Sequence, residues 1–219
     1  MSKQNNYEED SYKDYLYSGF LGKLFRKNHQ LMEVYNFKEV DKILEVGGGF
    51  EPHINYVKTK FNDYYSVDLD TVSGLKEYIK KNYNKIKFSY YEGKKLDFPN
   101  NFFDRIVISH CLEHILEPEK FVNEMLRVLN KNGIISIALP CDPGILWRMG
   151  RFLMKKTYLK RNKDEEYDHD YMIATEHVNS IFNLYVILNR KFKVVKKIFY
   201  PVNINIIDIN LFYICQIQK

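Results

Sequence analysis

From residue 42 onward, short apolar runs alternate with longer amphipathic stretches, and this alternation constrains the fold more than any other feature. The runs have the length and β-branched content of buried strands, whereas the stretches between them repeat apolar residues at helical spacing. Steady alternation requires parallel strands joined by right-handed crossovers, and hence a doubly wound α/β sheet. Strands are expected at 42–46, 64–68, 86–91, 105–109 and 134–139, and helices at 52–61, at 74–83 and from Pro118 to the Asn132-Gly133 turn.

The C-terminal part breaks this alternation. After a helix expected at 178–190, two apolar runs at 192–199 and 211–218 follow with no helix between them. A connection that short suits an antiparallel pair at the edge of a sheet. We therefore predict a mostly parallel, seven-stranded, Rossmann-like sheet with an antiparallel C-terminal edge pair.

Charge and cysteine content argue against several classes of protein. The net charge is +5, and the basic residues are scattered except for one run at 148–163, so nothing demands a nucleic-acid partner. The cysteines at 111, 141 and 215 are far apart and show no zinc-binding spacing, which indicates reduced thiols. The N-terminus is polar and no apolar run reaches the length of a membrane span, so we expect a cytoplasmic protein without a membrane partner.

A carboxylate followed by a glycine turn marks the expected ligand site. Glu45 lies near the end of the first strand, and residues 47–49 are all glycine, which lets the backbone approach a ligand closely. The positive end of the helix expected from Pro52 would favour a ligand carboxylate, and Glu45 could take an ammonium group. Asp68, 21 residues beyond the first glycine, stands where an acid meets ribose hydroxyls in mononucleotide folds. The pattern predicts a ligand that carries a ribose, an amino group and a carboxylate.

These residues resemble the signature of the class I S-adenosylmethionine-dependent methyltransferases, especially their type 11 families of small-molecule enzymes. The first motif of that group, E-x-G-x-G-x-G, is matched by Glu45, Gly47 and Gly49, with Glu51 in place of the last glycine. Asp68 corresponds to the acid that ends the second strand in the same group. Glu51 is therefore the one departure from this motif, on the side of the methionine end.

Three further stretches are similar to later motifs of the same group. Residues 91–104 follow G-D-A-x-x-L-P-F-P-D-N-S-F-D, residues 109–115 follow S-x-x-L-E-H-V, and residues 176–181 look like E-H-V-x-x-F. The resemblance spans residues 42 to about 200. It implies that the protein binds S-adenosylmethionine, with Glu92 and Gly93 at the adenine. The expected cofactor-binding residues are Glu45, Gly47, Gly48, Gly49, Asp68, Leu69, Glu92, Gly93 and Ser109.

We expect a single methyltransferase domain over residues 1–219, because a chain of this length with 45% apolar residues can bury one core. Residues 1–40, which include Tyr7, Tyr12, Tyr15 and Tyr17, would form an N-terminal helical cap. The cofactor-binding core would span 42–140, a covering insertion 144–175, and the last helix and edge strands 176–219. The cap and the insertion are expected to cover the carboxyl ends of the strands, where open α/β sheets bind ligands.

Histidines near the expected methyl position are the candidate catalytic residues. Methyl transfer from a sulfonium is an in-line displacement that depends mainly on alignment, and a base is needed only if the acceptor must lose a proton. By the resemblance, His177 faces the acceptor, and His110 flanks the end of the fourth strand; both could instead be structural. Although His110, Glu113 and His114 could hold a divalent ion, we expect hydrogen bonds within the loop and no metal site.

The acceptor is left open by the sequence. We favour a hydroxyl oxygen of a small molecule; N- or C-methylation and a non-catalytic S-adenosylmethionine-binding regulator are the alternatives. The basic run at 148–163 would steer an acidic or phosphorylated acceptor, or pair with the acidic stretch at 164–170. A dehydrogenase would show G-x-G-x-x-G, where this chain has Pro52 at the last position. A DNA-base methyltransferase of the amino type would show D/N-P-P-Y/F, which is missing after the fourth strand. The oligomeric state is undetermined at this stage.

Overall fold

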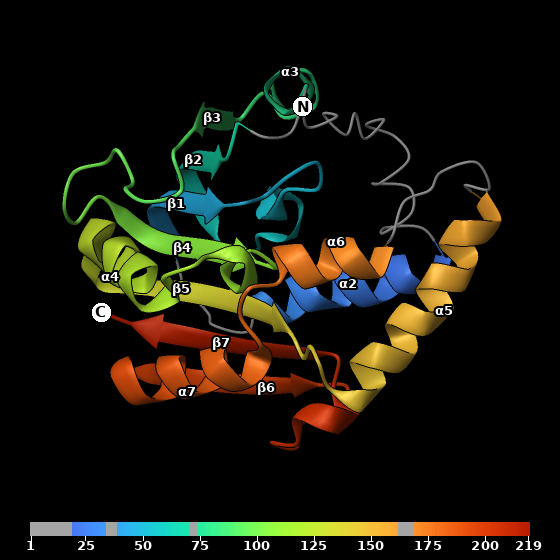
Figure 1. The fold of residues 1–219 in the computed structure, drawn as a ribbon. Helices are drawn as coiled ribbons and strands as arrows, with labels where there is room; N and C mark the ends of the chain where they lie inside the picture. The colour runs from blue at the N-terminus through green and yellow to red at the C-terminus, as the bar shows by residue number, and fades with distance from the viewer. Residues whose placement is uncertain (1–18, 34–38, 71–73, 162–168) are drawn as a thin grey trace.

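One sheet forms the centre of the computed structural model, which describes residues 19–33, 39–70, 74–161 and 169–219. Its strands are β1 (Glu39–Val46), β2 (Lys60–Asp68), β3 (Ile86–Tyr90), β4 (Phe103–Ser109), β5 (Leu129–Pro140), β6 (Val194–Tyr200) and β7 (Phe212–Gln218). They lie in the order β3-β2-β1-β4-β5-β7-β6 (Figure 1). The first five strands run parallel, and β7 runs antiparallel to both β5 and β6. The predicted mostly parallel sheet with an antiparallel C-terminal edge pair is therefore confirmed.

Helices cover both faces of the sheet. They are α2 (Gly19–Met32), α3 (Leu75–Asn82), α4 (Pro118–Val128), α5 (Ile145–Arg161), α6 (His169–Glu176) and α7 (Ile181–Lys191), with short 3-10 turns η1 (His53–Tyr56), η2 (Leu112–His114) and η3 (Ile207–Ile209). α4 packs on β5 and beside α7, whereas α2 packs on β5 and β7 and α3 on β3. The four tyrosines expected in the N-terminal cap lie outside the described residues.

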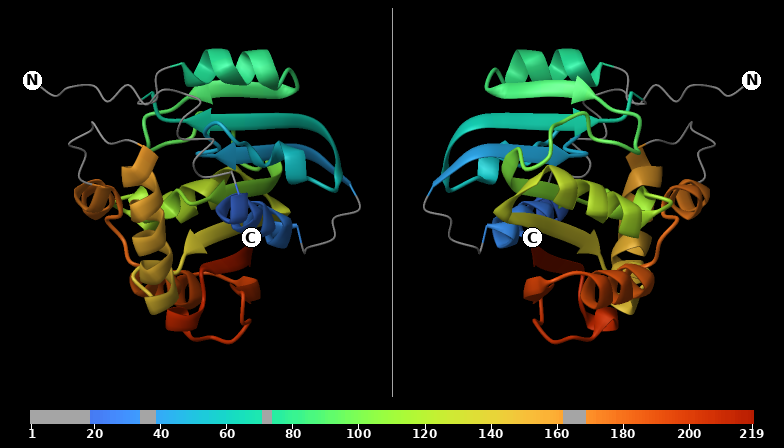
Figure 2. Two further views of the ribbon diagram at one scale, coloured as in Figure 1. Left: turned by 90° about the vertical axis from the view of Figure 1, so that its right-hand side faces the viewer. Right: turned by 90° about the vertical axis from the view of Figure 1, so that its left-hand side faces the viewer.

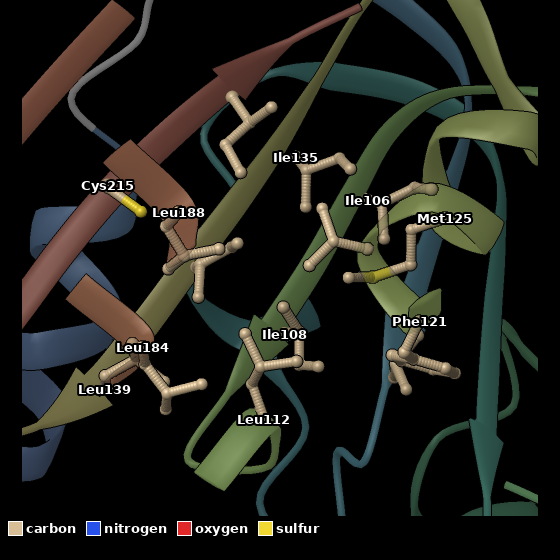
Figure 3. Close-up of a cluster of buried hydrophobic side chains, with 14 of the residues drawn as sticks. Ile106, Ile108, Leu112, Phe121, Met125, Ile135, Leu139, Leu184, Leu188 and Cys215 are labelled. Carbon is tan, nitrogen blue, oxygen red and sulfur yellow. The ribbon is translucent and has the colours of Figure 1, made fainter. Parts of the chain in front are cut away.

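Each face of the sheet has its own hydrophobic core, because successive strand residues point to opposite sides. In β4, Ile106 and Ile108 pack toward α4 and α7, where Met125 and Leu188 meet them (Figure 3). Val107, between them, packs into the second core with residues of α2 and α3. A fully buried aliphatic side chain stabilises the fold by roughly 1.5–3 kcal/mol, so these two layers fix the strand positions.

A buried ion pair joins the end of α2 to the sheet. Glu33 follows α2, and its carboxylate pairs with Arg105 of β4 and lies 2.7 Å from His53 Nε2. Burial would raise the pKa of Glu33, but its hydrogen bonds with His53 and Arg105 hold that pKa at about 2. Arg105 also donates to the backbone oxygen of Met32 at 3.3 Å. These contacts hold α2 beside the carboxyl ends of the strands.

Two of the expected helix boundaries are wrong. Instead of a helix at 52–61, the chain makes only η1 and then enters β2 at Lys60, where it pairs with the polar start of β1. The helix that begins at Pro118 ends at Val128, not at Asn132-Gly133. Those two residues lie inside β5, where a Cβ on Gly133 would come within 2.6 Å of Leu129 Cγ.

The carboxyl ends of β1, β2, β4 and β5 meet along one edge of the sheet. The strand order reverses between β1 and β4, and open α/β sheets bind ligands at such a switch point. α5 and α6, from the expected covering insertion, lie beyond the arrowheads of β1, β4 and β5 (Figures 1 and 2). Among the described helices, none is both long and apolar enough to cross a membrane.

Candidate active site

The glycine turn after β1 needs glycine for both conformation and space. Gly47 and Gly49 have φ angles of +70° and +53°, in the left-handed region that disfavours other residues. A Cβ on Gly47 would lie 2.7 Å from the Sγ of Cys111, which follows β4. A Cβ on Gly49 would have no described atom within 4 Å. The turn therefore packs against Cys111 at Gly47, and it borders open space at Gly49.

Asp68, at the end of β2, is joined to this turn. Its Oδ2 accepts a hydrogen bond from Gly49 N at 3.0 Å, and its Oδ1 accepts one from Leu69 N at 2.8 Å. Burial raises the pKa of Asp68, against the effect of these two bonds. A carboxylate oxygen has a second lone pair, so Asp68 can still accept from a ligand hydroxyl.

Leu69 and Gly93 lie together at the rim of the same region. A Cβ on Gly93, where φ is +76°, would come within 3.2 Å of Leu69 Cδ2. Tyr91 N donates to the carbonyl of Asp68 at 3.0 Å, which holds the two segments side by side. Glu92 is exposed next to them. The structure thus brings together the two segments that the resemblance places at the ribose and the adenine.

Glu45 is enclosed behind the glycine turn. Its Oε1 accepts from His53 N at 2.7 Å and its Oε2 accepts from the hydroxyl of Tyr64 at 2.8 Å. A Cβ on Gly48 would lie 2.7 Å from its carboxyl carbon, so only glycine fits there. Burial raises the pKa of Glu45 to about 7, despite both hydrogen bonds. The predicted contact of Glu45 with an ammonium group stays a prediction, and the carboxylate supports the turn from within.

Ser109 and His110, at the end of β4, are held by Asn28 of α2. Asn28 Nδ2 lies 3.2 Å from both the Ser109 hydroxyl oxygen and His110 Nε2. Because the amide nitrogen can only donate, His110 Nε2 accepts and the ring proton lies on Nδ1. His110 has a φ of +50°, and its ring is enclosed by aromatic side chains that include Phe25 and Phe212. Burial lowers its pKa to about 3, so the ring is neutral at physiological pH.

His177 is oriented by Asp142, the second residue after β5. The distance from His177 Nδ1 to Asp142 Oδ2 is 2.9 Å, and Arg151 of α5 lies 3.3 Å from the other carboxylate oxygen. The backbone oxygen of Asp142 accepts from Ile181 N at 2.9 Å. A cavity of about 300 Å³ opens beside this pair, and residues that line it include Asp142, Arg151, Ala174, His177 and Asn179.

Glu113 and His114 in η2 face the same histidine. The rings of His114 and His177 are 4.8 Å apart in an edge-to-face arrangement, and His114 Nδ1 lies 2.9 Å from the carbonyl of Glu176. Glu113 is buried, and burial raises the pKa of Glu113 to about 7. The side chain of His114 was expected to bond within its own loop, but its Nδ1 bonds to Glu176, 62 residues further along the chain. The side chain of Glu113 has its nearest histidine nitrogens 3.8 and 4.0 Å away, beyond hydrogen-bond distance.

Sequence reasoning missed Asn28, Asp142 and Cys111. Asn28 lies in the polar part of an N-terminal helix, more than 80 residues before the histidine that it contacts. Asp142 precedes a proline after a strand, a pattern that signals a turn and no chemistry. Cys111 follows a motif histidine, yet only the fold shows that it faces Gly47.

The glycine turn, Asp68, Leu69 and Gly93 fit a nucleoside that carries an amino-acid substituent. The turn is open at Gly49, the Asp68 carboxylate faces it, and Leu69 and Gly93 offer an apolar rim of the kind that packs on a base. Together with the topological switch between β1 and β4, these features lie where the resemblance places the cofactor.

Comparison with known proteins agrees with this geometry. Residues 44–137 match the type 11 family described as "Methyltransferase domain". The chain is 28% identical over 134 residues to the demethylmenaquinone methyltransferase of Paenarthrobacter aurescens, covering 58% of this chain and 50% of that protein. It is 38% identical over 55 residues to the ubiquinone/menaquinone biosynthesis C-methyltransferase UbiE of Coxiella burnetii, covering 25% and 22%. The matched part thus spans half or less of the length of these relatives.

The fold is also similar to that of solved methyltransferases. A S-adenosylmethionine-dependent methyltransferase from Aquifex aeolicus superposes with a TM-score of 0.57 at 17% identity, covering 95% of this chain and 93% of that one. The fold is that of the class I S-adenosylmethionine-dependent methyltransferases, and residues 44–137 carry the methyltransferase family match. The match of residues 44–137 to the type 11 family model agrees with the sequence motifs.

Proposed function

We propose that the protein transfers the methyl group of S-adenosylmethionine to a hydroxyl oxygen of a small-molecule acceptor. The observation that carries the acceptor side of this proposal is the His177–Asp142 pair beside a cavity at the carboxyl edge of the sheet. The family match supports S-adenosylmethionine as the cofactor. Because the matched part covers only half of the demethylmenaquinone methyltransferase, the activity of the whole protein belongs to this proposal.

Asp68, the glycine turn and the 91–93 segment would hold the cofactor. Asp68 would accept hydrogen bonds from the ribose hydroxyls, and the backbone at 47–49 would lie against the methionine end. Leu69, Glu92 and Gly93 would border the adenine, with Ser109 at the end of β4 nearby. When bound, the cofactor supplies a methyl group on a sulfonium, which is electrophilic without further activation.

His177 would act on the acceptor through Nε2. Because the Nδ1–H group of His177 donates a hydrogen bond to Asp142, the lone pair of the ring lies on Nε2. A hydroxyl is a poor nucleophile until its proton is removed or its oxygen is polarised, and a positioned group that does this typically contributes 10²–10⁴-fold. His110, neutral and held by Asn28, would border the acceptor and position it without taking the proton.

Arg151 bears on the charge of the acceptor. Of the basic run, Lys163 lies outside the described residues, and Arg151 is paired with Asp142. This pairing offsets one positive charge at the cavity. An acidic or phosphorylated acceptor therefore stays a prediction, which the positive charge of exposed Arg148 in α5 would favour.

A C-methyltransferase is the second candidate. The similarity to relatives named as a demethylmenaquinone methyltransferase and a quinone-biosynthesis C-methyltransferase favours it. An acidic carbon must lose a proton, as a hydroxyl must, so His177 would serve either acceptor. A neutral amine can attack without a group that removes a proton, so the His177–Asp142 pair favours N-methylation less than O- or C-methylation.

Cofactor binding and turnover test the proposal separately. The purified protein should melt at a higher temperature with S-adenosylhomocysteine, because a ligand of the native state stabilises it, and should not respond to NAD. His177→Ala should keep the shift with S-adenosylhomocysteine while turnover on hydroxylated acceptors falls roughly 10²–10⁴-fold. Val178→Ala, an exposed neighbour, is the matched control and should change neither. A shift with NAD alone would refute the cofactor, and full activity of His177→Ala would refute the role of the histidine.

A further inference from the structure

Three possible metal ligands converge beside the cavity. Glu113 and His114 come from η2, after β4, and His177 comes from the segment before α7. One donor atom from each of these residues lies within 4.8 Å of the other two. Backbone contacts set this spacing, since Asn179 N donates to the carbonyl of Glu113 at 3.0 Å and Asn179 Nδ2 to that of Ile115 at 2.6 Å. The three side chains are held together although His114 and His177 are 63 positions apart in the chain.

In both His114 and His177, the ring nitrogen Nδ1 already has a hydrogen-bond partner. His114 Nδ1 lies 2.9 Å from the carbonyl of Glu176, and His177 Nδ1 lies 2.9 Å from Asp142 Oδ2. Since carbonyl and carboxylate oxygens only accept, each Nδ1 carries the proton and each Nε2 presents a lone pair. Histidines that bind metals almost always donate their second nitrogen in this way, often to a carboxylate.

Glu113 supplies an independent sign of a missing partner. The residue is 2% exposed, and its Oε2 has no hydrogen-bond partner among the described residues. The nearest histidine nitrogens to Oε1 are His110 Nδ1 at 3.8 Å and His114 Nε2 at 4.0 Å. A buried polar group without a partner destabilises a fold by about 1–3 kcal/mol, so such groups call for an explanation.

We propose that Glu113, His114 and His177 bind a divalent transition-metal ion, and that the acceptor oxygen completes its coordination. Two imidazoles and one carboxylate are a ligand set typical of zinc and ferrous iron, and three protein ligands leave positions open for a substrate. Metal–ligand bonds of about 2.0–2.2 Å would bring the donor atoms to about 3–3.5 Å from one another, so donor atoms that are now up to 4.8 Å apart would need to close by roughly 1.3–1.8 Å.

This second half of the inference rests on the proposed function and changes the role of His177 in it. With Nε2 bound to the ion, His177 activates the acceptor through the ion and does not take the proton itself. A cation polarises a bound hydroxyl and lowers its pKa. The O–H bond then breaks with the electron pair left on oxygen and the proton released to water, so no oxidant or reductant is required. The oxygen forms its bond to the methyl carbon as the carbon–sulfur bond breaks.

Binding of Co²⁺ alone tests the site without any acceptor. The chelator-treated, full-length protein should bind one equivalent, with the visible absorption of a four- or five-coordinate ion. Glu113→Gln and His114→Gln should each abolish this absorption. Asp142→Asn, which removes the carboxylate that orients His177, should weaken binding by roughly 10–100-fold. Glu117→Gln, an exposed carboxylate after η2, is the control and should bind as the parent does.

The thermal shift with S-adenosylhomocysteine, measured on the same samples, separates the two hypotheses. Variants that keep this shift are folded, so their loss of Co²⁺ reports on the site. No Co²⁺ binding by the parent protein, or equal binding by Glu113→Gln, would overturn the metal site and leave the methyltransferase proposal intact. Co²⁺ binding by a parent protein that shows no thermal shift with S-adenosylhomocysteine would instead count against the proposed function.

Discussion

Replacing Glu45 by glutamine should stabilise the protein relative to the parent, and this advantage in the free energy of unfolding should grow as the pH rises. The folded-state pKa of Glu45 is about 7, against an ordinary value of 4.5, because the carboxyl is buried. A folded pKa above the unfolded one gives stability that is present below pH 4.5 and lost as the pH rises through 7. At about 1.4 kcal/mol for each pH unit between these values, ionisation of Glu45 lowers the free energy of unfolding by about 3 kcal/mol at pH 8.

Glutamine at this position keeps most of the local hydrogen bonds. Its carbonyl oxygen can accept from His53 N, and its amide can donate to the hydroxyl oxygen of Tyr64. Any bond that the substitution loses costs the same at every pH. The free energy of unfolding of Glu45→Gln, relative to the parent, should therefore rise by about 2–3 kcal/mol between pH 5 and pH 8.

Urea denaturation of both proteins at several pH values between 5 and 8 measures this difference directly. Glu77→Gln, an exposed carboxylate in α3, is the control for removal of a negative charge. A relative stability that is flat with pH, or that falls as the pH rises, would show that the Glu45 carboxylate is stabilised where it lies. S-adenosylhomocysteine affinity of the same variant tests the predicted ammonium contact, since loss of the negative charge should weaken it.

Two further substitutions test the turn and the ribose contact. Asp68→Ala should weaken S-adenosylhomocysteine binding by roughly 1.5–3 kcal/mol for each charged hydrogen bond lost, as titration calorimetry would show; unchanged affinity would remove Asp68 from the site. Gly47→Ala should lower the free energy of unfolding by about 2–4 kcal/mol, because it combines a left-handed backbone with a Cβ only 2.7 Å from Cys111 Sγ. Adding Cys111→Ala should recover the packing part of that loss, and strict additivity of the two changes would contradict the contact.

The fold was predictable because the buried strands are visible as apolar runs. The errors occur where polar residues take part in pairing. The start of β1 is charged, and Lys60–Asp63 of β2 pairs with it, so hydrophobic periodicity could not extend either strand. Asn132-Gly133 signals a turn, but there the absence of a Cβ on Gly133 allows its backbone to lie close to the Leu129 side chain within β5.

The cofactor side was more predictable than the acceptor side. Gly47, Gly49 and Asp68 follow strand ends at recognisable spacing, and parallel strands bring such ends together. The partners of the histidines carry no such pattern. Asn28 reaches His110 only because a buried ion pair positions α2, and Asp142 reaches His177 only because α7 begins beside the end of β5.

The order of these groups along the chain bears on how such proteins can diverge. Every residue assigned to the ribose and adenine lies between 45 and 93, and the family match ends at residue 137, before Asp142. The cavity beside His177 is built mainly from residues 142–180, one continuous stretch. Insertions, deletions or recombination within that stretch could therefore reshape the cavity beside His177, while His110, Glu113, His114 and the residues assigned to the nucleoside stay unaltered.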